Sequence, residues 1–165
     1  GAINLEKDKR FEFVYNQINM SLNFEKHDCL DFSEKNIKKV DTSYLGKIFA
    51  KVASASFGYN VNYKTILKII DSKNIDLYLY KIVDNFLCCG IIFYDSLNNA
   101  GLHMIGTVPD ERGKGIGKQM TQKLINEAKS KNKSYCVLHA SKMGKPIYLK
   151  LGFKEYGDIK TYRIL

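Results

Sequence analysis

The residues best suited to chemistry lie in one glycine-rich stretch, which reads TVPDERGKGIGK at positions 107–118. Its three glycines occupy every second position, and three cationic side chains accompany them: Arg112, Lys114 and Lys118. Glycine lets a backbone adopt a positive φ and approach a ligand closely. The first amides of a following helix would add unpaired donors at the positive end of the helix dipole. The stretch therefore predicts a binding site for an anion such as a phosphate group.

Two elements are expected to position this loop. Residues 101–108 alternate in character, a pattern typical of a β-strand. After the loop, apolar residues recur with the period of an amphipathic helix, at Ile116, Met120, Leu124, Ile125 and Ala128. The glycines should therefore lie at a turn between the end of a strand and the start of a helix.

Two other glycine-rich phosphate loops do not fit the spacing. A Walker loop needs Ser or Thr after its lysine, but Gln119 follows Lys118, and its earlier glycine would have to be Arg112. A dinucleotide-binding loop needs glycines spaced as G-x-G-x-x-G and an acidic residue at the end of the next strand. This chain has G-x-G-x-G, and its next expected strand ends at His139.

A third pattern does fit. The order Arg-x-x-Gly-x-Gly after a strand resembles the cofactor loop of the GNAT (Gcn5-related N-acetyltransferase) superfamily. A second segment, YLKLGF at 148–153, resembles the superfamily's other signature, and one expected helix and one expected strand separate the two. The motifs lie within residues 101–156, and the order of elements extends the resemblance to residues 34–165. The resemblance implies acetyl transfer from acetyl-CoA to an amine.

The resemblance also implies which residues hold acetyl-CoA. Main-chain amides of the loop would bind its pyrophosphate, with Arg112 opening the loop and Lys118 flanking it; these amides belong to Gly113, Lys114, Gly115, Ile116 and Gly117. Thr107 would offer backbone groups to the pantetheine arm, and the amide of Ile105 would polarise the acetyl carbonyl. Ser141 stands where many members have an asparagine that contacts the cofactor.

For catalysis, the resemblance implies Tyr148 as the acid that protonates the departing thiolate. Members often have a carboxylate base on the strand before the loop, but the residues expected to share that face are Gly101, His103, Ile105 and Thr107. Of these, only His103 has a suitable pKa, about 6.5 when unperturbed, so it is the candidate base. Deprotonation through water, or binding of an already neutral amine, stays open, and His139 is a weaker candidate.

The remaining pattern predicts a single α/β (α+β) domain. Residues 34–40 should form its first strand, and Asp41 or Thr42 should cap a helix that ends near Gly58. The expected elements that follow are a helix at 62–72, strands at 75–83, 86–94 and 101–108, the loop helix, a strand at 135–139, a helix at 142–151 and a strand at 162–165. This order predicts a mixed central sheet flanked by helices.

The first residues are harder to assign. Phe11, Phe13 and Tyr15 alternate like a short strand, as do Met20, Leu22 and Phe24, so a hairpin or an extension is expected there. We divide the chain into an N-terminal extension, residues 1–33, and an acetyltransferase domain, residues 34–165. The opening Gly-Ala pair is interpreted as a tag remnant and is left out of fold reasoning.

Composition narrows the class of protein. The hydrophobic fraction of 45% over 165 residues is ordinary for one globular domain. The net charge of +9 comes mostly from lysine and includes no run of five basic residues, so no nucleic-acid partner is expected. No apolar run reaches the roughly 18 residues of a membrane span. The four cysteines form no C-x-x-C pair, which predicts a reduced cytoplasmic protein without a metal site.

These observations predict an N-acetyltransferase that moves an acetyl group from acetyl-CoA to a primary amine of a small molecule or a protein. The alternative is a non-catalytic acyl-CoA-binding module, which the missing carboxylate base favours. The resemblance implies that residues 54–62 line the acceptor side, but these residues do not select among antibiotic amines, polyamines, amino acids and protein N-termini. Nothing in the sequence excludes a homodimer.

Overall fold

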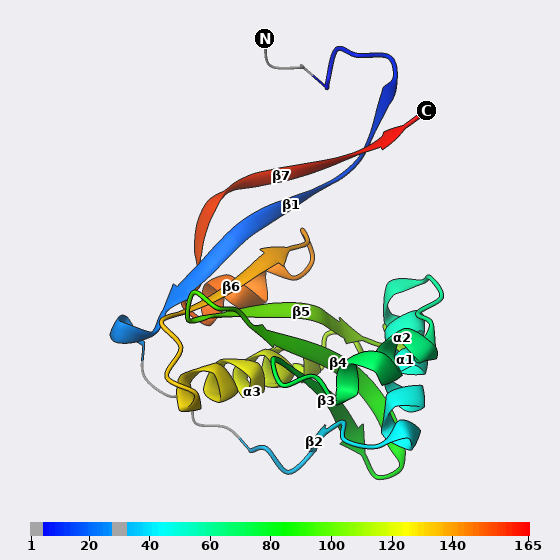
Figure 1. Cartoon of the computed structure of the whole chain (residues 1–165), viewed down its shortest axis with the longest axis vertical. Coiled ribbons are helices and arrows are strands. Elements are labelled where there is room, and N and C mark those ends of the chain that lie inside the picture. The colour runs from blue at the N-terminus through cyan, green and yellow to red at the C-terminus, as the bar shows by residue number, and fades with distance from the viewer. Residues whose placement is uncertain (1–4, 28–32) are drawn as a thin grey trace.

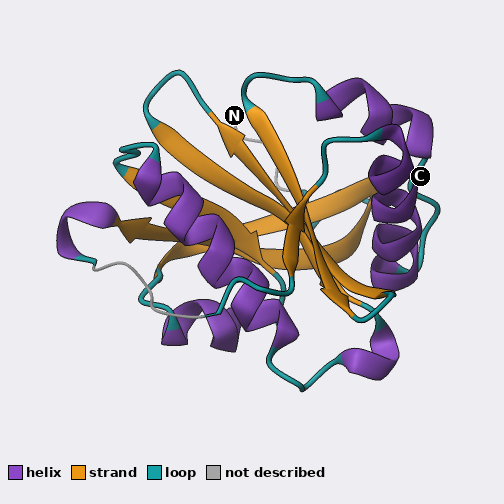
Figure 2. Cartoon of the chain, turned by 90° about the horizontal axis from the view of Figure 1, so that it is seen from below, coloured by secondary structure: helices purple, strands orange, loops and turns teal. Residues whose placement is uncertain are grey.

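The structure, a computed structural model, describes residues 5–27 and 33–165. These residues form one mixed sheet of seven strands with helices on both faces (Figures 1 and 2), which confirms the fold class predicted from the sequence. The sheet order is β2-β3-β4-β5-β6-β1-β7; β5 and β6 run parallel and the other neighbours antiparallel. The strands are β1 (Phe11–Asn23), β2 (Ile37–Lys39), β3 (Ile75–Ile82), β4 (Asn85–Tyr94), β5 (Asn99–Thr107), β6 (Tyr135–Ala140) and β7 (Lys154–Ile164).

The helices pack in two layers against this sheet. One apolar cluster lies beneath α3 and α4 and includes Met120, Leu124 and Leu138. The other lies beneath α1 and α2 and includes Phe49 and Leu79. The helices are α1 (Ser43–Phe57), α2 (Tyr63–Ile70), α3 (Ile116–Ser130) and α4 (Lys145–Lys150), with short 3-10 turns at η1 (Phe24–Lys26) and η2 (Pro109–Glu111). From β2 onward, the order of elements is the one predicted.

The ends of α1 follow the expected capping chemistry. The Thr42 hydroxyl accepts a hydrogen bond from the Leu45 amide at 3.2 Å and so satisfies a donor of the first turn. At the other end, Gly58 is left-handed with a φ of 74°, and its amide donates to the Ser54 carbonyl at 2.9 Å. The helix therefore stops where the sequence predicted.

The N-terminal segment, for which a hairpin or an extension was expected, forms one continuous strand and no hairpin between residues 11 and 23. β1 is inserted between β6 and β7, and Met20 and Leu22 are buried in the cluster beneath α3. Figure 1 shows the first half of β1 and the end of β7 running beyond the rest of the sheet as a two-stranded ribbon. β7 begins at Lys154, well before the expected residue 162. The sequence did not reveal its first half because most side chains of β7 are exposed, so there is no apolar alternation to detect.

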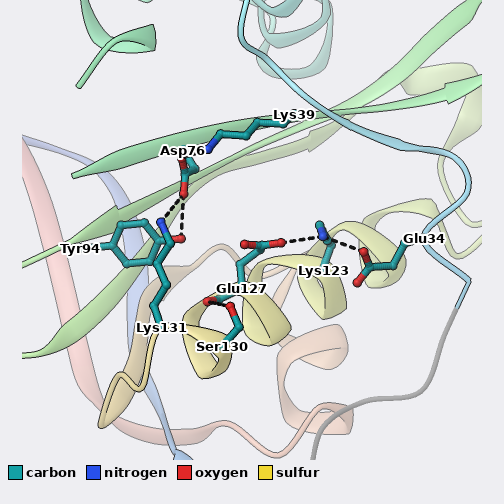
Figure 3. A network of polar contacts seen from close by, with 8 residues as sticks. All are labelled: Glu34, Lys39, Asp76, Tyr94, Lys123, Glu127, Ser130 and Lys131. Carbon is teal, nitrogen blue, oxygen red and sulfur yellow. Dashed lines mark hydrogen bonds and ion pairs between the residues drawn. The ribbon is translucent and has the colours of Figure 1, made fainter. Parts of the chain in front are cut away.

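A network of charged side chains joins the edge of the sheet to α3 (Figure 3). Asp76 on β3 is only 7% exposed and accepts contacts from Lys39 at 2.6 Å, Lys131 at 2.7 Å and the Tyr94 hydroxyl at 3.0 Å. Burial alone would raise the pKa of Asp76, but these hydrogen bonds outweigh it and hold the pKa below its usual value. The network fixes the end of α3 against β2, β3 and β4. A neighbouring ion pair of Lys123 with Glu34 and Glu127 also appears in Figure 3.

The cysteines of the described residues lie inside the protein. Cys88, Cys89 and Cys136 are buried free thiols, and Cys29 lies outside the described residues. Burial raises the pKa of Cys88 to about 11, so this thiol stays protonated near neutral pH. Within residues 5–27 and 33–165, none of the helices has both the length and the apolar character that a membrane crossing requires.

Candidate functional site

The glycine loop connects the end of β5 to the start of α3. Gly113 and Gly115 have φ values of 79° and 80°, in the left-handed region that favours glycine. A Cβ atom placed on either residue would meet no other atom within 4 Å. The loop therefore follows a backbone path that glycine adopts without strain and has open space beside it, which suits the close approach of a ligand.

The first turn of α3 leaves several amides unpaired by the helix. Its N-cap residue is Gly115, and no side chain of the described residues caps it. The first hydrogen bond of the helix runs from the Gln119 amide to the Gly115 carbonyl at 3.1 Å. The amides of Ile116, Gly117 and Lys118 precede it at the positive end of the helix dipole. This end of α3 can bind an anion.

Arg112 holds the loop in place through two main-chain carbonyls. Its Nε donates to the Thr107 carbonyl at 3.2 Å and its Nη2 to the Ser56 carbonyl at 2.7 Å. The guanidinium thus ties the loop to the end of β5 and to the last turn of α1. Lys114 is exposed, and its ammonium pairs with Glu111 at 2.9 Å. Lys118 is also exposed at the start of the helix.

A bulge in β5 lies just before the loop. On one side of it His103 pairs with Ile91, and on the other Gly106 pairs with Cys89, so two residues of β5 face the single Gly90 of β4. Met104 accommodates the extra residue with a φ of 49°. A bulge of this kind shifts the alternation of side chains along a strand by one residue.

The bulge overturns one expectation from the sequence, which placed Gly101, His103, Ile105 and Thr107 on one face. Ala100 and Leu102 are buried in the α3-side cluster, so Gly101 and His103 face the α1 side of the sheet, where a Cβ on Gly101 would lie 2.8 Å from the His103 ring. Ile105 packs against the α3-side cluster, and a Cβ on Gly117 of α3 would lie 3.4 Å from the Thr107 hydroxyl. The expectation is wrong because it assumed uninterrupted alternation through residues 103–105.

β5 and β6 separate near the bulge. Their parallel pairing covers only Asn99, Ala100 and Gly101 of β5, opposite Tyr135–Val137 of β6. Beyond Gly101, β5 continues toward the glycine loop without β6 as a paired neighbour. The diverging strands place the bulge residues Met104 and Ile105 at the edge of this opening.

Tyr148 lies on the α3 side of the sheet. It packs against the α3-side cluster, with its ring centre 5.8 Å from that of Phe153 in an edge-to-face arrangement. Burial, and then the proximity of Cys88, raises the pKa of the Tyr148 phenol to about 12. The absence of a side chain at Gly144 permits this packing, because a Cβ there would lie 3.0 Å from the Tyr148 ring. The Ser141 hydroxyl accepts from the Gly144 amide at 3.1 Å.

His103 lies on the opposite side of the sheet from Tyr148. It lines an open depression of about 260 Å³ that is also formed by Asn19, Met20, Ser21, Gly101, Val137, Leu138, His139 and Tyr156. Partial burial, and then the neighbouring His139, lowers the pKa of His103 from its usual value. A histidine in this setting is largely neutral near pH 7 and can accept a proton.

The predicted site residues therefore fall into two groups. The loop residues 113–118, Thr107 and Tyr148 lie on the α3 side, whereas His103 lies on the α1 side. Two neighbours, Ser56 and Cys88, were not predicted as site residues. Ser56 contributes a main-chain carbonyl to Arg112, and no sequence pattern marks such a role. Cys88 lies beside Tyr148, but the sequence shows it only as part of an apolar strand.

Comparison with known proteins identifies the family. The sequence model of the acetyltransferase (GNAT) domain matches residues 36–162, and the chain therefore belongs to the GNAT acetyltransferase family. The comparison with curated proteins gave no match. The family assignment agrees with the glycine loop, the diverging strands and the seven-stranded sheet described above.

Solved structures share this fold at low sequence identity. A predicted acetyltransferase of Clostridium acetobutylicum, solved with acetyl-CoA, has 21% identity and a TM-score of 0.62 over 73% of this chain and 90% of its own. The ribosomal-protein-S18-alanine N-acetyltransferase of Escherichia coli has 18% identity and a TM-score of 0.63 over 73% of this chain and 78% of its own. These likenesses show the fold alone.

Other similar structures are longer than this chain. A protein of the GNAT family from Novosphingobium aromaticivorans has 14% identity and a TM-score of 0.69, with 92% of this chain matched. The match covers 66% of that protein, and a GNAT protein of Kribbella flavida is covered over 58%. The chain thus spans less than two thirds of the length of these relatives.

Proposed function

We propose that this chain is an N-acetyltransferase that moves an acetyl group from acetyl-CoA to a primary amine by direct attack. The observation that carries the proposal is the uncapped, glycine-lined start of α3 beside the diverging strands β5 and β6. Amides of residues 113–118 would bind the pyrophosphate, with Lys118 adding charge. Thr107 would offer backbone groups to the pantetheine arm, and Ser141 would contact the cofactor nearby.

The two faces of the sheet would bring in different substrates. Ile105, Thr107 and Tyr148 lie on the α3 side, so the thioester would enter from there along the loop. His103 lies on the α1 side, so the amine would enter through the open depression. The opening between β5 and β6 would bring the two together, and holding both reactants in one place removes much of the entropic barrier. The Ile105 amide would stabilise the charge that develops on the acetyl oxygen.

His103 would act as the base and Tyr148 as the acid in this reaction. The lowered pKa of His103 keeps it neutral near pH 7, ready to take the proton that the amine nitrogen loses when it attacks the thioester. Tyr148, with a pKa of about 12, stays protonated and would donate to the departing sulfur. Because a free thiol has a pKa of about 8.5, the thiolate leaves readily, and donation from Tyr148 would assist its departure.

A non-catalytic acyl-CoA-binding module is the second candidate. It is favoured by one observation: β5 carries no carboxylate between Asn99 and Thr107. The two functions differ in turnover. A module would bind acetyl-CoA and release no CoA thiol with any amine, whereas an enzyme would release thiol in proportion to the amine added.

The deciding experiment is an assay of thiol release with acetyl-CoA and a panel of amines that includes polyamines, amino acids, antibiotic amines and short peptides. The proposal expects thiol release with at least one amine and its loss, with acetyl-CoA binding retained, in Tyr148→Phe. Binding of acetyl-CoA without turnover of any amine, and with the same affinity in Tyr148→Phe, would favour the binding module.

A further inference from the structure

The helix pair α1–α2 carries an unbalanced positive charge. Between Thr42 and Ile70 the sequence holds four lysines (Lys47, Lys51, Lys64 and Lys68) but no aspartate or glutamate, although the whole chain has 17 acidic residues. Within residues 5–27 and 33–165, none of these lysines takes part in an ion pair. Their charges are therefore not neutralised by neighbouring carboxylates.

Three of these lysines surround a groove between the two helices. The groove encloses about 890 Å³ and is lined by Lys47, Ala50, Lys51, Ser54, Asn60, Val61, Asn62, Tyr63 and Lys64. Lys47 and Lys51 lie one turn apart on α1, and Lys64 lies in the first turn of α2. A concave surface lined by charges of one sign concentrates the field within it, so the groove attracts anions.

The shape of the groove is fixed without a ligand. The Ser54 hydroxyl donates to the Ala50 carbonyl at 2.7 Å and accepts from the Val61 amide at 2.9 Å, which ties the connecting loop to α1. The Asn62 side chain accepts from the Lys64 amide at 2.9 Å and holds the start of α2. Preformed walls lower the cost of ordering when a partner binds.

The groove also lies close to the face on which His103 lies. Ser54 in the groove precedes Ser56 and Phe57 by less than one helical turn. Those two residues pack so closely on β5 that a Cβ on Gly106 would lie 2.8 Å from each of them. A chain bound in the groove could therefore continue over the end of α1 toward the open depression.

We propose that this groove binds an acidic segment of a polypeptide, whose carboxylates contact Lys47, Lys51 and Lys64. The inference rests on the proposed function in one respect: the amine to be acetylated would belong to that acidic polypeptide. The site would then select its acceptor by charge at a distance from the reacting amine, while the depression around His103 receives the amine.

A polypeptide fits the lining better than a nucleic acid does. The groove contains lysine but no arginine, and arginine is the residue that binds phosphates through paired hydrogen bonds. Asn60 offers an amide donor and an amide acceptor, and Asn62, whose oxygen caps α2, offers its amide donor; these match the groups of a peptide backbone. Carboxylates need only the point charge that a lysine ammonium supplies.

The test uses a fluorescent peptide of twelve residues rich in Glu and Asp, with a free α-amino group, and a peptide in which Gln and Asn replace the acids. Fluorescence anisotropy measures Kd for the whole chain at low salt and at 0.5 M salt. The acidic peptide should bind at least about tenfold more tightly than the neutral one, and salt should weaken its binding. The triple variant Lys47→Glu/Lys51→Glu/Lys64→Glu should lose about 10- to 100-fold in affinity.

A matched variant separates the groove from net charge. Lys9→Glu/Lys26→Glu/Lys154→Glu makes the same change in charge at exposed lysines outside α1 and α2, and it should keep the affinity of the wild type. Equal losses in both triple variants, or equal binding of the acidic and neutral peptides, would overturn the inference. Tighter binding of a single-stranded oligonucleotide than of the peptide, lost in the same groove variant, would also overturn it.

Two further readouts keep this inference distinct from the proposed function. The groove variant should retain its thermal shift with acetyl-CoA, because Lys47, Lys51 and Lys64 take no part in the contacts of Arg112 and Lys114 described for the glycine loop. Acetylation of simple amines without preference for the acidic peptide would overturn the role of the groove in choosing the acceptor, while the proposed acetyltransferase activity would stand. Binding of the acidic peptide in a protein that acetylates no amine would overturn the acceptor role.

Discussion

His103 and Ile105 lie two positions apart on β5, yet their side chains project from opposite faces of the sheet. The bulge at Met104 causes this reversal. It separates a histidine that faces the open depression from the side chain of Ile105, which packs against the α3-side cluster. In the proposed reaction, this relationship lets one strand serve the amine on one side and the thioester on the other.

His103→Gln should lower kcat/KM by about 10- to 100-fold, in line with loss of a general base. In the wild type, kcat/KM should rise as pH increases through the lowered pKa of His103, below about 6.5, and stay level above it. The variant should lack that rise. Substitution of His139 by Gln removes a neighbouring charge, so it should move the rise to higher pH. An unchanged profile in His103→Gln would exclude this histidine as the base.

Tyr148→Phe should lower kcat by about 10²–10³-fold while acetyl-CoA binding stays nearly the same. The phenol is proposed to act on the departing sulfur, so its loss affects the chemical step more than binding. Tyr44→Phe is a matched control, because Tyr44 is 70% exposed on α1 and lies outside the site. Steady-state kinetics and a binding isotherm for each variant would measure the two effects. Weaker acetyl-CoA binding with an unchanged kcat would show that Tyr148 only packs in the site and does not act as the acid.

Gly106→Ala should destabilise the contact between α1 and β5. A Cβ at this position would lie 2.8 Å from both Ser56 and Phe57, which is closer than ordinary contact. We expect a loss of about 1–3 kcal/mol in unfolding free energy, as for other overpacked sites. Gly157→Ala would impose backbone strain without a clash, since a Cβ there meets nothing within 4 Å. Urea denaturation would give the unfolding free energy of both variants and so compare the cost of crowding at Gly106 with the cost of backbone strain at Gly157.

Asp76→Asn should cost about 1–3 kcal/mol of stability near pH 7, because it leaves Lys39 and Lys131 without their shared carboxylate. Both lysines are partly exposed, which limits the cost. The pKa of Asp76 is lowered in the folded state, so its stabilisation is present above the unfolded pKa of about 3.9. That contribution is lost as pH falls through the folded pKa. The wild type and the variant should therefore converge in unfolding free energy at acid pH.

Much of the fold could be predicted because local signals agree with it. Thr42 and Gly58 mark the ends of α1 through capping chemistry that depends only on nearby residues. The glycine loop was recognisable because its three glycines and the apolar period after Ile116 occur in one short stretch. The family model and the sheet confirm the fold class that these patterns indicated.

The parts that were missed depend on contacts between distant residues. Nothing near Phe11–Asn23 in the sequence shows that this strand inserts between β6 and β7. The bulge at Met104 has no glycine to mark it, so the alternation appeared uninterrupted. The partners of Arg112 are main-chain carbonyls, which every residue has. The assignment of individual site residues stays a prediction.

The most direct test is a thermal melt with and without acetyl-CoA, made on the wild type, Gly115→Glu and Gly58→Glu. Gly58 has a left-handed φ of 74° and open space for a Cβ, so a side chain there imposes the same backbone strain as at Gly115, but Gly58 ends α1 and is not part of the glycine loop. Acetyl-CoA at 100 times its Kd should add about 2.7 kcal/mol, or about 5–10 °C, to the wild type and to Gly58→Glu. Gly115→Glu should show no shift. Equal shifts in all three proteins, or none in a folded wild type, would contradict acetyl-CoA binding at the glycine loop.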